Sequence, residues 1–485
     1  MLFTLILYSI ILILIITYII VYIKQYEYFK ARQIPGPTPS YFYGNVKTLW
    51  NAKSPSRQLA EWSKQFGKIY GIFEGTRPHY IVSDVDFLQE VFIKQFSHFP
   101  IRKTTIFSKA LNKGKRIHLF SALGTRWKRQ RNVINPTFSA VKLKQMSPLI
   151  NNCINELMKK LPDYSEKHED FNIYVLYKRL TMDVICRCAF GVDTDMQNNP
   201  DNIYLKKVGQ AFSVNFQNMP LFKLGTLVPP VGVIVGDLFI FQNKVRQKLN
   251  QLFPSTIKKF EPIPGTWIMA RVGEVIEMRS DVAKQRVDLL QLMLEAASRE
   301  QIKDKKDDVD EQYIAKKLTY DEVIANVFLF MIAGYETTST ALAYCTYVLA
   351  NHPEEQLKLQ EEIDEYLLQN EDEEDPDYDV INRMPYMDMV IKEVLRMHPI
   401  AISGIMNREC TQETDICGIK ITKGAIIQPD VYSIHFDQEL WGPQDVNGFC
   451  PERHLTKRHP LAFTAFGVGP RNYYHSHMSY CHLNL

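Results

Sequence analysis

Residues 319–350 read TYDEVIANVFLFMIAGYETTSTALAYCTYVLA and contain no proline. Thr319 and Glu322 have the spacing of a capping box, in which each side chain bonds the other residue's backbone N–H, so they predict the start of a helix. The next proline is Pro353, which predicts a helix of about 33 residues and about 50 Å. Its apolar part, Val323–Tyr335, is interrupted by an asparagine and is too short to span a membrane, so we expect a buried core helix.

Polar residues interrupt this helix in the run AGYETT at 333–338. Gly334 costs about 1 kcal/mol in mid-helix relative to alanine, and it leaves room beside the backbone for a flat or bulky group. Glu336 and Thr337 place an acid and a hydroxyl in an apolar helix, which is unfavourable unless they have partners or a function. Two interpretations stay open: a helix-packing glycine with Thr337 bonded back to a carbonyl oxygen, or a local kink that delivers an acid–alcohol pair for proton transfer.

Composition restricts the class of protein. The 485 residues include 57 Lys and Arg and 54 Asp and Glu, a net charge of +3, which argues against a nucleic-acid-binding protein. Apolar residues make up 46%, which excludes global disorder. The eight cysteines form no CxxC pair, so they indicate a reducing compartment rather than a disulfide framework.

The N-terminal segment has the length of a membrane anchor. Leu2–Ile23 is uncharged and almost wholly apolar, and as a helix it would extend about 33 Å, against a hydrocarbon core of about 30 Å. No basic residue precedes the run and no small-residue cleavage site follows it, which favours a retained anchor over a signal peptide. Lys24, Lys30 and Arg32 follow, so the positive-inside rule predicts a cytosolic C-terminal part. The segment 35–39, PGPTP, predicts a stiff, extended hinge.

The remainder is predicted to be mainly α with a smaller β portion. Strands are expected at Ile69–Phe73 and Tyr80–Val82 as a hairpin, and again around Ile419–Ile421 and Ala425–Ile427 with a turn between them. Helical periodicity dominates from about residue 120 to 400. The predicted organisation is an anchor (1–23), a basic and Pro-rich hinge (24–39), one large domain (40–472) and an atypical tail (473–485).

Five motifs in order resemble those of the haem-thiolate cytochrome P-450 family. They are W-x-x-x-R at Trp127–Arg131, the oxygen-binding helix at Ala333–Thr338, E-x-x-R at Glu393–Arg396, P-E-R within Cys450–His454, and the start of the haem loop F-G-x-G-x-R-x-C-x-G at Phe466–Arg471. Each motif is weak alone, but together they cover essentially residues 1–472. The resemblance implies a cytochrome P-450 fold and, from the run GYETTS, the animal xenobiotic- and steroid-oxidising branch.

The resemblance assigns a haem-binding role to residues from four parts of the chain: Trp127, Arg131, Arg408 and Arg471 at the propionates, and Ala333, Gly334 and Phe466 as further cofactor contacts. An indole N–H and a guanidinium four residues apart share one helix face and suit a carboxylate. The alternative for this helix is a solvated basic face, because Arg126, Lys128 and Arg129 accompany them.

Two further sets of residues receive roles from the resemblance. Thr337 is implied to hydrogen-bond dioxygen, and Glu336 to help supply the protons for O–O cleavage. Glu393 and Arg396 are implied to join Arg453 in a buried structural network, with a surface ion pair as the alternative. Position 454 is His where the family usually has an aromatic residue.

The haem loop departs from the family at its most important position. The cysteine that ligates the iron is expected two residues after Arg471, where this chain has Tyr473. The tail Tyr473–Leu485 shows no helical apolar pattern, so we interpret the fold as C-terminally truncated, through a change of reading frame, a mis-joined exon or a truncated product. Tyr can ligate haem iron but does not supply the electron density of a thiolate; His475 and His477 are further candidate ligands.

The resemblance therefore predicts a haem-dependent monooxygenase that oxidises apolar small molecules with dioxygen. Electrons would come from NADPH through a reductase partner, and the protein would lie in the endoplasmic reticulum membrane with its catalytic domain in the cytosol. Because of Tyr473, we expect little such activity from the chain. The alternatives are an inactive or haem-free pseudo-enzyme, and a Tyr- or His-ligated haem protein with catalase- or peroxidase-like activity.

Overall fold

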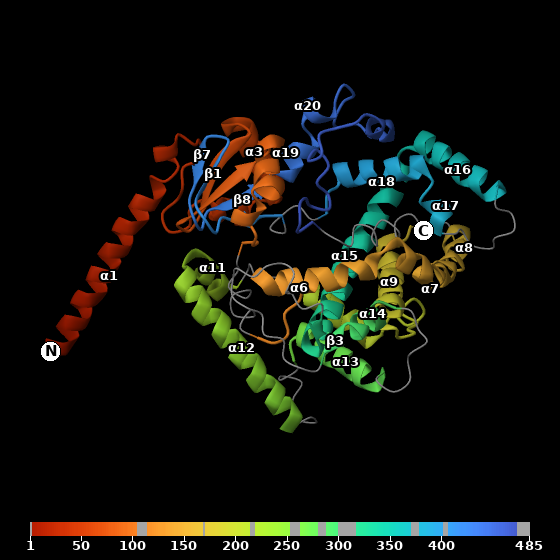
Figure 1. Ribbon diagram of the computed structural model, residues 1–485, viewed down its shortest axis with the longest axis horizontal. Coiled ribbons are helices and arrows are strands. Elements are labelled where there is room, and N and C mark those ends of the chain that lie inside the picture. The colour runs from red at the N-terminus through yellow and green to blue at the C-terminus, as the bar shows by residue number, and fades with distance from the viewer. Residues whose placement is uncertain are drawn as a thin grey trace.

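The computed structural model of the protein describes residues 2–103, 114–167, 170–213, 219–252, 262–279, 288–298, 317–369, 378–400 and 406–472. The predicted tail, Tyr473–Leu485, lies outside these residues. The described chain is mainly helical with a small sheet portion at one end (Figure 1). The mainly α prediction is therefore confirmed.

The helices are α1 (Leu2–Tyr26), α2 (Val46–Asn51), α3 (Pro55–Phe66), α4 (Val85–Gln89), α6 (Gly124–Ile134), α7 (Ala140–Met158), α8 (Leu161–Glu166), α9 (Ile173–Ile185), α10 (Ile203–Ser213), α11 (Pro220–Leu227), α12 (Pro229–Leu252), α13 (Pro264–Arg279), α14 (Leu289–Glu295), α15 (Tyr320–Ala350), α16 (Pro353–Leu368), α17 (Tyr378–Ile381), α18 (Pro385–Met397), α19 (Val431–His435) and α20 (Gln438–Trp441). Proline opens α3, α16 and α18, where its missing N–H costs no intrahelical hydrogen bond.

The main sheet has four strands in the order β1 (Ile69–Glu74), β2 (Arg77–Val82), β8 (Ile426–Pro429) and β5 (Arg408–Glu409). β2 and β8 are parallel, and the other neighbours are antiparallel. The two-stranded sheets are β3 (Ala297–Ser298) with β4 (Leu318–Thr319), and β6 (Thr414–Ile416) with β7 (Ile419–Ile421). The predicted hairpin is confirmed as β1–β2. The strands expected near 419–421 and 425–427 also form, but they pair with β6 and with β2 and β5 rather than with each other.

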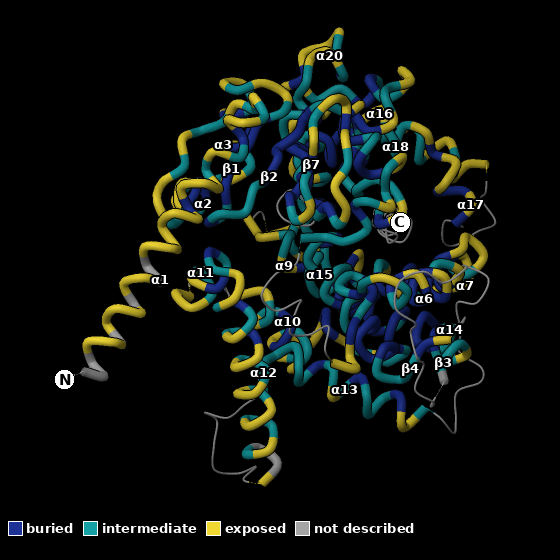
Figure 2. The backbone as a smooth tube through the Cα atoms, turned by 60° about the vertical axis from the view of Figure 1, so that its left-hand side comes forward, coloured by how far each residue is buried: buried dark blue, intermediate teal, exposed yellow. Residues whose placement is uncertain are grey.

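Apolar residues gather in two main cores. The larger, here the helical core, contains buried side chains of α6, α7, α9, α13, α14 and α15. The smaller, here the sheet core, contains Tyr80, Val82 and Ile427 together with Phe87 and Phe92, which follow β2. Figure 2 shows the buried segments inside the body and the exposed ones along its outer helices. Two buried arginines described below, Arg408 and Arg471, contact the sheet core and the helical core respectively.

Helix α15 runs through the helical body and begins as its sequence predicts. The Thr319 hydroxyl accepts a bond from the Glu322 N–H at 3.2 Å, and the Glu322 carboxylate accepts one from the Thr319 N–H at 2.9 Å. The predicted capping box is therefore confirmed. α15 contacts α9, α13 and α18, which places the AGYETT run within the body.

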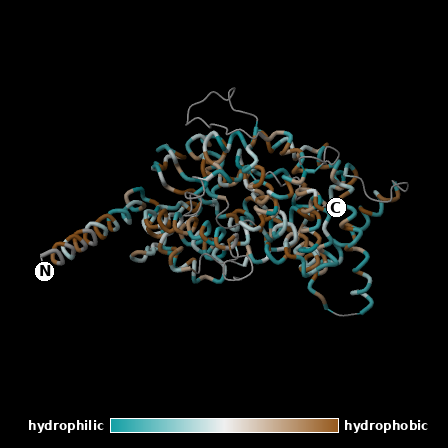
Figure 3. The backbone as a smooth tube through the Cα atoms, turned by 90° about the horizontal axis from the view of Figure 1, so that it is seen from below, coloured by the Kyte–Doolittle hydropathy of each residue, from teal (hydrophilic) through white to brown (hydrophobic). Residues whose placement is uncertain are grey.

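Helix α1 extends away from the body at one end of the molecule (Figure 3). Within the described part of the chain, no helix combines the length and the apolarity needed for a membrane span, so the transmembrane anchor stays a prediction. The base of α1 is fixed to the body: Tyr22 and Phe29 are buried, Tyr22 donates a hydrogen bond to the Phe42 carbonyl, and Tyr26 donates one to the Ser40 carbonyl at 3.0 Å. The predicted hinge is extended only after a short 3-10 turn at Lys30–Arg32, since its first residues continue α1.

Candidate functional site

Helix α6 carries the W-x-x-x-R motif and uses two of its faces. On one face, both η nitrogens of Arg129 bond the Glu322 carboxylate at 2.8 Å, and Arg126 Nε bonds it at 2.7 Å. Burial raises the pKa of Glu322, but the hydrogen bonds and charges of Arg129 and Arg126 outweigh it and lower the pKa to about 2. Arg129 is buried, so the alternative of a solvated basic face is wrong for this residue. The ion pairs of Arg126 and Arg129 with Glu322 therefore join α6 to the start of α15.

The opposite side of α6 contributes to a cluster of arginines from four separate segments. We call Arg102, Arg131, Arg408 and Arg471 the arginine cluster; Arg131, Arg408 and Arg471 are buried, and Arg102 is partly buried. Arg102 Nη2 donates to the Arg471 carbonyl at 2.9 Å, and Arg131 Nη2 donates to Asn472 Oδ1 at 2.7 Å. The resemblance assigned three of the four, Arg131, Arg408 and Arg471, to the haem propionates, and the structure places these three in one cluster.

The charges of the cluster repel one another. Burial, and then the charges of Arg102 and Arg131, lower the pKa of Arg471 to about 8. Burial, and then Arg102 and Arg471, place the pKa of Arg408 well below its usual range. Bringing like charges together in a buried site is unfavourable unless an anion joins them. The cluster is therefore arranged as a binding site for negative charge.

Several donors of the cluster have no acceptor. Within the described residues, Arg408 Nε and both Nε and Nη1 of Arg471 are buried and form no hydrogen bond. A buried donor without an acceptor costs free energy comparable to a lost hydrogen bond. The carboxylates of a haem group fit this set of donors, because guanidinium N–H groups bind carboxylates strongly. The residues present therefore fit the propionate end of a haem.

Aromatic rings support two of the cluster arginines. The Arg471 guanidinium lies 4.3 Å from the centre of the Trp127 ring, and the Arg408 guanidinium lies 4.6 Å from that of Phe92. Trp127 belongs to the helical core and Phe92 to the sheet core. Trp127 thus lies beside the cluster, where it stacks on an arginine, and its contact with a haem propionate stays a prediction.

Arg102 is a member of the cluster that the sequence motifs did not reveal. Its segment pairs with β5: the Glu409 N–H bonds the Ile101 carbonyl at 2.9 Å, and the Lys103 N–H bonds Asn407 Oδ1 at 2.6 Å. Arg102 therefore lies next to Arg408 through strand pairing between positions about 300 residues apart. No local pattern in the sequence distinguishes this arginine from a surface one.

Glu336 and Thr337 of α15 make contacts away from the cluster. Tyr174 of α9 donates a hydrogen bond to Glu336 Oε1, and Lys178 Nζ lies 3.2 Å from Oε2. The side chains of Glu336 and Lys178 are each 28% exposed, so this pair is in contact with solvent. The Thr337 hydroxyl donates to the Ala333 carbonyl at 2.5 Å. The acid therefore contacts α9, and the alcohol bonds back to its own helix.

Gly334 serves the packing of α9 against α15. A Cβ atom at this position would lie 3.0 Å from Cδ1 of Ile185, which is closer than ordinary contact. Helix α15 is continuous through the motif, from Tyr320 to Ala350. These contacts agree with the interpretation of a helix-packing glycine with a back-bonded Thr337. The haem contacts predicted for Ala333 and Gly334 stay predictions.

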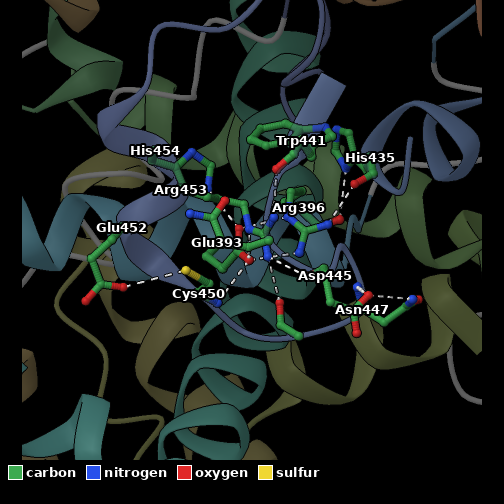
Figure 4. Close-up of polar contacts among 12 residues, drawn as sticks. Glu393, Arg396, His435, Trp441, Asp445, Asn447, Cys450, Glu452, Arg453 and His454 are labelled. Carbon is green, nitrogen blue, oxygen red and sulfur yellow. Dashed lines mark hydrogen bonds and ion pairs between the residues drawn. The ribbon is translucent and has the colours of Figure 1, made fainter. Parts of the chain in front are cut away.

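The E-x-x-R and P-E-R motifs meet in a buried network (Figure 4). Glu393 accepts bonds from Nε and Nη2 of Arg396 and from Nε of Arg453, all at 2.8 Å, and all three side chains are buried. Burial raises the pKa of Glu393, but the bonds from Arg396 and His454 and the arginine charges lower it to about 2. His454 Nε2 lies 3.0 Å from Glu393 Oε2, so the histidine of the unusual position 454 takes part in the network.

The start of the haem loop, residues 466–471, packs near α15 and α18 at one end and reaches the arginine cluster at the other. Phe466 packs against a small apolar cluster of Ala341, Ile391 and Leu395. Gly467 and Gly469 both have positive φ, a conformation that suits glycine. The loop continues to Arg471, and the predicted iron ligand Tyr473 lies outside the described residues. Its role stays a prediction.

A cleft on the described part of the molecule lies away from the arginine cluster. It has a volume of about 860 Å³ and is lined by residues of α7 together with Arg187, Asp195 and Asn198. None of the predicted site residues lines it. We therefore take the arginine cluster, with its unpaired N–H donors, as the candidate binding site.

Comparison with known proteins bears on the same regions. A family model described as Cytochrome P450 matches residues 34–472. Three Caenorhabditis elegans proteins named as cytochromes P450 are similar over most of the chain. CYP13A5 is 33% identical over 468 residues (93% of this chain and 85% of the relative), CYP13A4 is 32% identical over 480 residues (94% and 87%), and CYP13A2 is 32% identical over 468 residues (93% and 85%).

Proposed function

The chain belongs to the cytochrome P450 family, and from that premise we propose that it binds haem at the arginine cluster, in a fold built for oxidising apolar small molecules with dioxygen. Family membership supports haem-dependent monooxygenase chemistry in general. The observation that carries the proposal to this chain is the set of unpaired donors on Arg408 and Arg471. Electrons would come from NADPH through a reductase partner.

In the proposed function, different residues bind the cofactor and handle protons. The arginine cluster would hold the carboxylates of the haem, and Trp127 would keep Arg471 in place. The bound haem supplies the activation of dioxygen. Glu336 would exchange protons with solvent on the α9 side, where Tyr174 and Lys178 hold its two carboxylate oxygens. The Thr337 hydroxyl donates a hydrogen bond to the Ala333 carbonyl, which leaves its oxygen able to accept a hydrogen bond.

The experiment that tests this proposal is haem quantification on the purified full chain, followed by a spectrum of the reduced protein with carbon monoxide. We expect stoichiometric haem, but without the red-shifted Soret band of a thiolate, because Tyr473 occupies the predicted cysteine position. A preparation that takes up no haem overturns haem binding and leaves a haem-free pseudo-enzyme. A red-shifted band overturns our assignment of position 473.

Tyr473 also supports a second candidate function, a Tyr- or His-ligated haem protein with catalase- or peroxidase-like activity. This candidate requires that Tyr473→Phe alter the spectrum of the bound haem, or that His475→Ala or His477→Ala do so. A spectrum unchanged in all three variants removes it. The monooxygenase and peroxidase candidates are then separated by whether turnover consumes dioxygen or peroxide.

The proposal extends to a location in the endoplasmic reticulum membrane, with the catalytic domain in the cytosol. It is supported by the uncharged run Leu2–Ile23 and by the basic residues Lys24, Lys30 and Arg32 that follow it. We expect the full chain to stay with the membrane after alkaline extraction of microsomes, and a chain without residues 2–23 to be released. Release of both chains contradicts the anchor.

A further inference from the structure

The arginine cluster offers hydrogen-bond donors that the described part of the protein leaves without acceptors. Arg408 and Arg471 are 2% and 3% exposed, and three of their N–H-bearing nitrogens have no acceptor within the described residues. The two guanidiniums lie over the uncharged rings of Trp127 and Phe92. Among the described residues, neither guanidinium is paired with a carboxylate, so a bound anion would interact strongly with both.

The cluster is complete without the predicted iron ligand. Its four arginines come from the segment before residue 103, from α6, from β5 and from the loop residues just before Asn472. The donors that Arg408 and Arg471 offer therefore lie entirely within the described residues and do not depend on the side chain at position 473.

The geometry of the cluster is held by the surrounding protein. Asn407 is buried; its side chain accepts from the Lys103 N–H at 2.6 Å, and its carbonyl accepts from Arg408 Nη1 at 2.8 Å. One residue thus fixes both the segment that carries Arg102 and the guanidinium of Arg408. Arg471 is fixed by its Nη2, which donates to the Ala122 carbonyl at 2.9 Å. A preorganised site of this kind loses little freedom when its ligand binds.

We propose that the arginine cluster binds planar tetrapyrrole dicarboxylates through their carboxylates whether or not the ring holds iron, so that metal-free protoporphyrin IX is a ligand of this chain. This inference rests on the proposed function, because the same cluster is taken to hold haem. It goes beyond that function in assigning the affinity to the acid end of the ligand. It also names a ligand that supports no oxygen chemistry.

The test is a fluorescence titration of the purified full chain with protoporphyrin IX, with haem titrated in parallel. Protoporphyrin IX dimethyl ester serves as the matched ligand, since it keeps the ring and loses both charges. Arg471→Gln and Arg408→Met remove buried, unpaired donors, and Arg57→Gln, at an exposed position, serves as the control variant. Circular dichroism reports whether each variant folds, and Asn407→Ala gives an independent variant outside the cluster.

We expect the diacid to bind with an affinity within about tenfold of that of haem, and the diester to bind at least about tenfold more weakly. Arg471→Gln and Arg408→Met should each weaken binding of the diacid by about tenfold or more. Asn407→Ala should also weaken binding of the diacid, and Arg57→Gln should leave it unchanged. Binding of haem without binding of the diacid overturns the inference and leaves the proposed function standing. Equal binding of diacid and diester also overturns it. Binding of neither haem nor the diacid overturns both.

Discussion

At the scale of single residues, Glu393 shows how a buried charge is kept in this fold. Its carboxylate bonds Arg396 and Arg453, and it also accepts the Cys450 N–H at 3.2 Å. His454 is partly buried; burial lowers its pKa, the adjacent Glu393 carboxylate acts in the opposite direction, and His454 Nε2 lies 3.0 Å from Glu393 Oε2. Removing one partner of such a network leaves the others buried without compensation.

The substitution Glu393→Gln should therefore destabilise the protein by about 3–5 kcal/mol, because it leaves two buried guanidiniums without an anion. Urea unfolding at neutral pH measures the change. The control is Glu413→Gln, since Glu413 forms an exposed ion pair with Lys420 and should matter little. Equal effects of the two variants would show that the network does not stabilise the fold.

The same residue predicts a dependence on pH. The pKa of Glu393 falls from 4.5 to about 2 on folding, so its contribution is fully present above pH 4.5 and is lost as pH falls through 4.5 towards 2. The shift corresponds to about 3 kcal/mol. The unfolding free energy of the native chain, measured between pH 6 and pH 3, should fall more steeply than that of Glu393→Gln. Parallel curves would contradict the shift.

Residue-scale motifs predicted the members of this network, because short spacings such as E-x-x-R describe one helix face. The resemblance also assigned Arg131, Arg408 and Arg471 to the haem propionates; the structure places these arginines in one cluster, and the haem contact itself stays a prediction. The motifs missed Arg102, whose position depends on the pairing of residues 101–103 with β5. The motifs also could not decide whether Arg129 is buried or solvated, because only its buried partner Glu322 distinguishes it from a surface arginine.

At the scale of elements, α15 and α9 illustrate what a sequence pattern can and cannot decide. The start of α15 was predicted from its capping box, and its end from the proline that opens α16. The reason for Gly334 could not be decided, because it depends on which helix lies opposite. The structure places Ile185 of α9 there, and a Cβ atom at position 334 would lie only 3.0 Å from its Cδ1. Likewise, β8 was expected as a strand, but its parallel partner β2 comes from a distant segment near the start of the chain.

This packing predicts a coupling between two substitutions. Gly334→Ala gains about 1 kcal/mol of helix propensity but crowds Cδ1 of Ile185, an atom that Ile185→Val removes. We therefore expect Gly334→Ala to be more favourable in the Ile185→Val background than in the native one, by about 1 kcal/mol. A double-mutant cycle of unfolding free energies measures the difference. Strict additivity would show that the two side chains do not meet.

At the scale of the whole molecule, the arginine cluster lies between the two cores. Arg471 stacks on Trp127 of the helical core, and Arg408 stacks on Phe92 of the sheet core. Mutual repulsion among these arginines opposes the approach of the two cores, and a dianion would reverse the sign of that interaction. A ligand that bridges the cluster should therefore stabilise both parts of the molecule together.

Hydrogen exchange measures this effect region by region. At a free protoporphyrin IX concentration of about 100 times its dissociation constant, mass action adds about 2.7 kcal/mol to the stability of the bound state. We expect the slowest amides of β1 and β2 and those of α9 to gain protection by similar amounts, because each region unfolds only after the ligand leaves. The dimethyl ester, which leaves the arginines unpaired, should protect neither region. Protection confined to α9 would mean that the ligand contacts the helical core alone, and that Arg408 and the sheet stay outside the site.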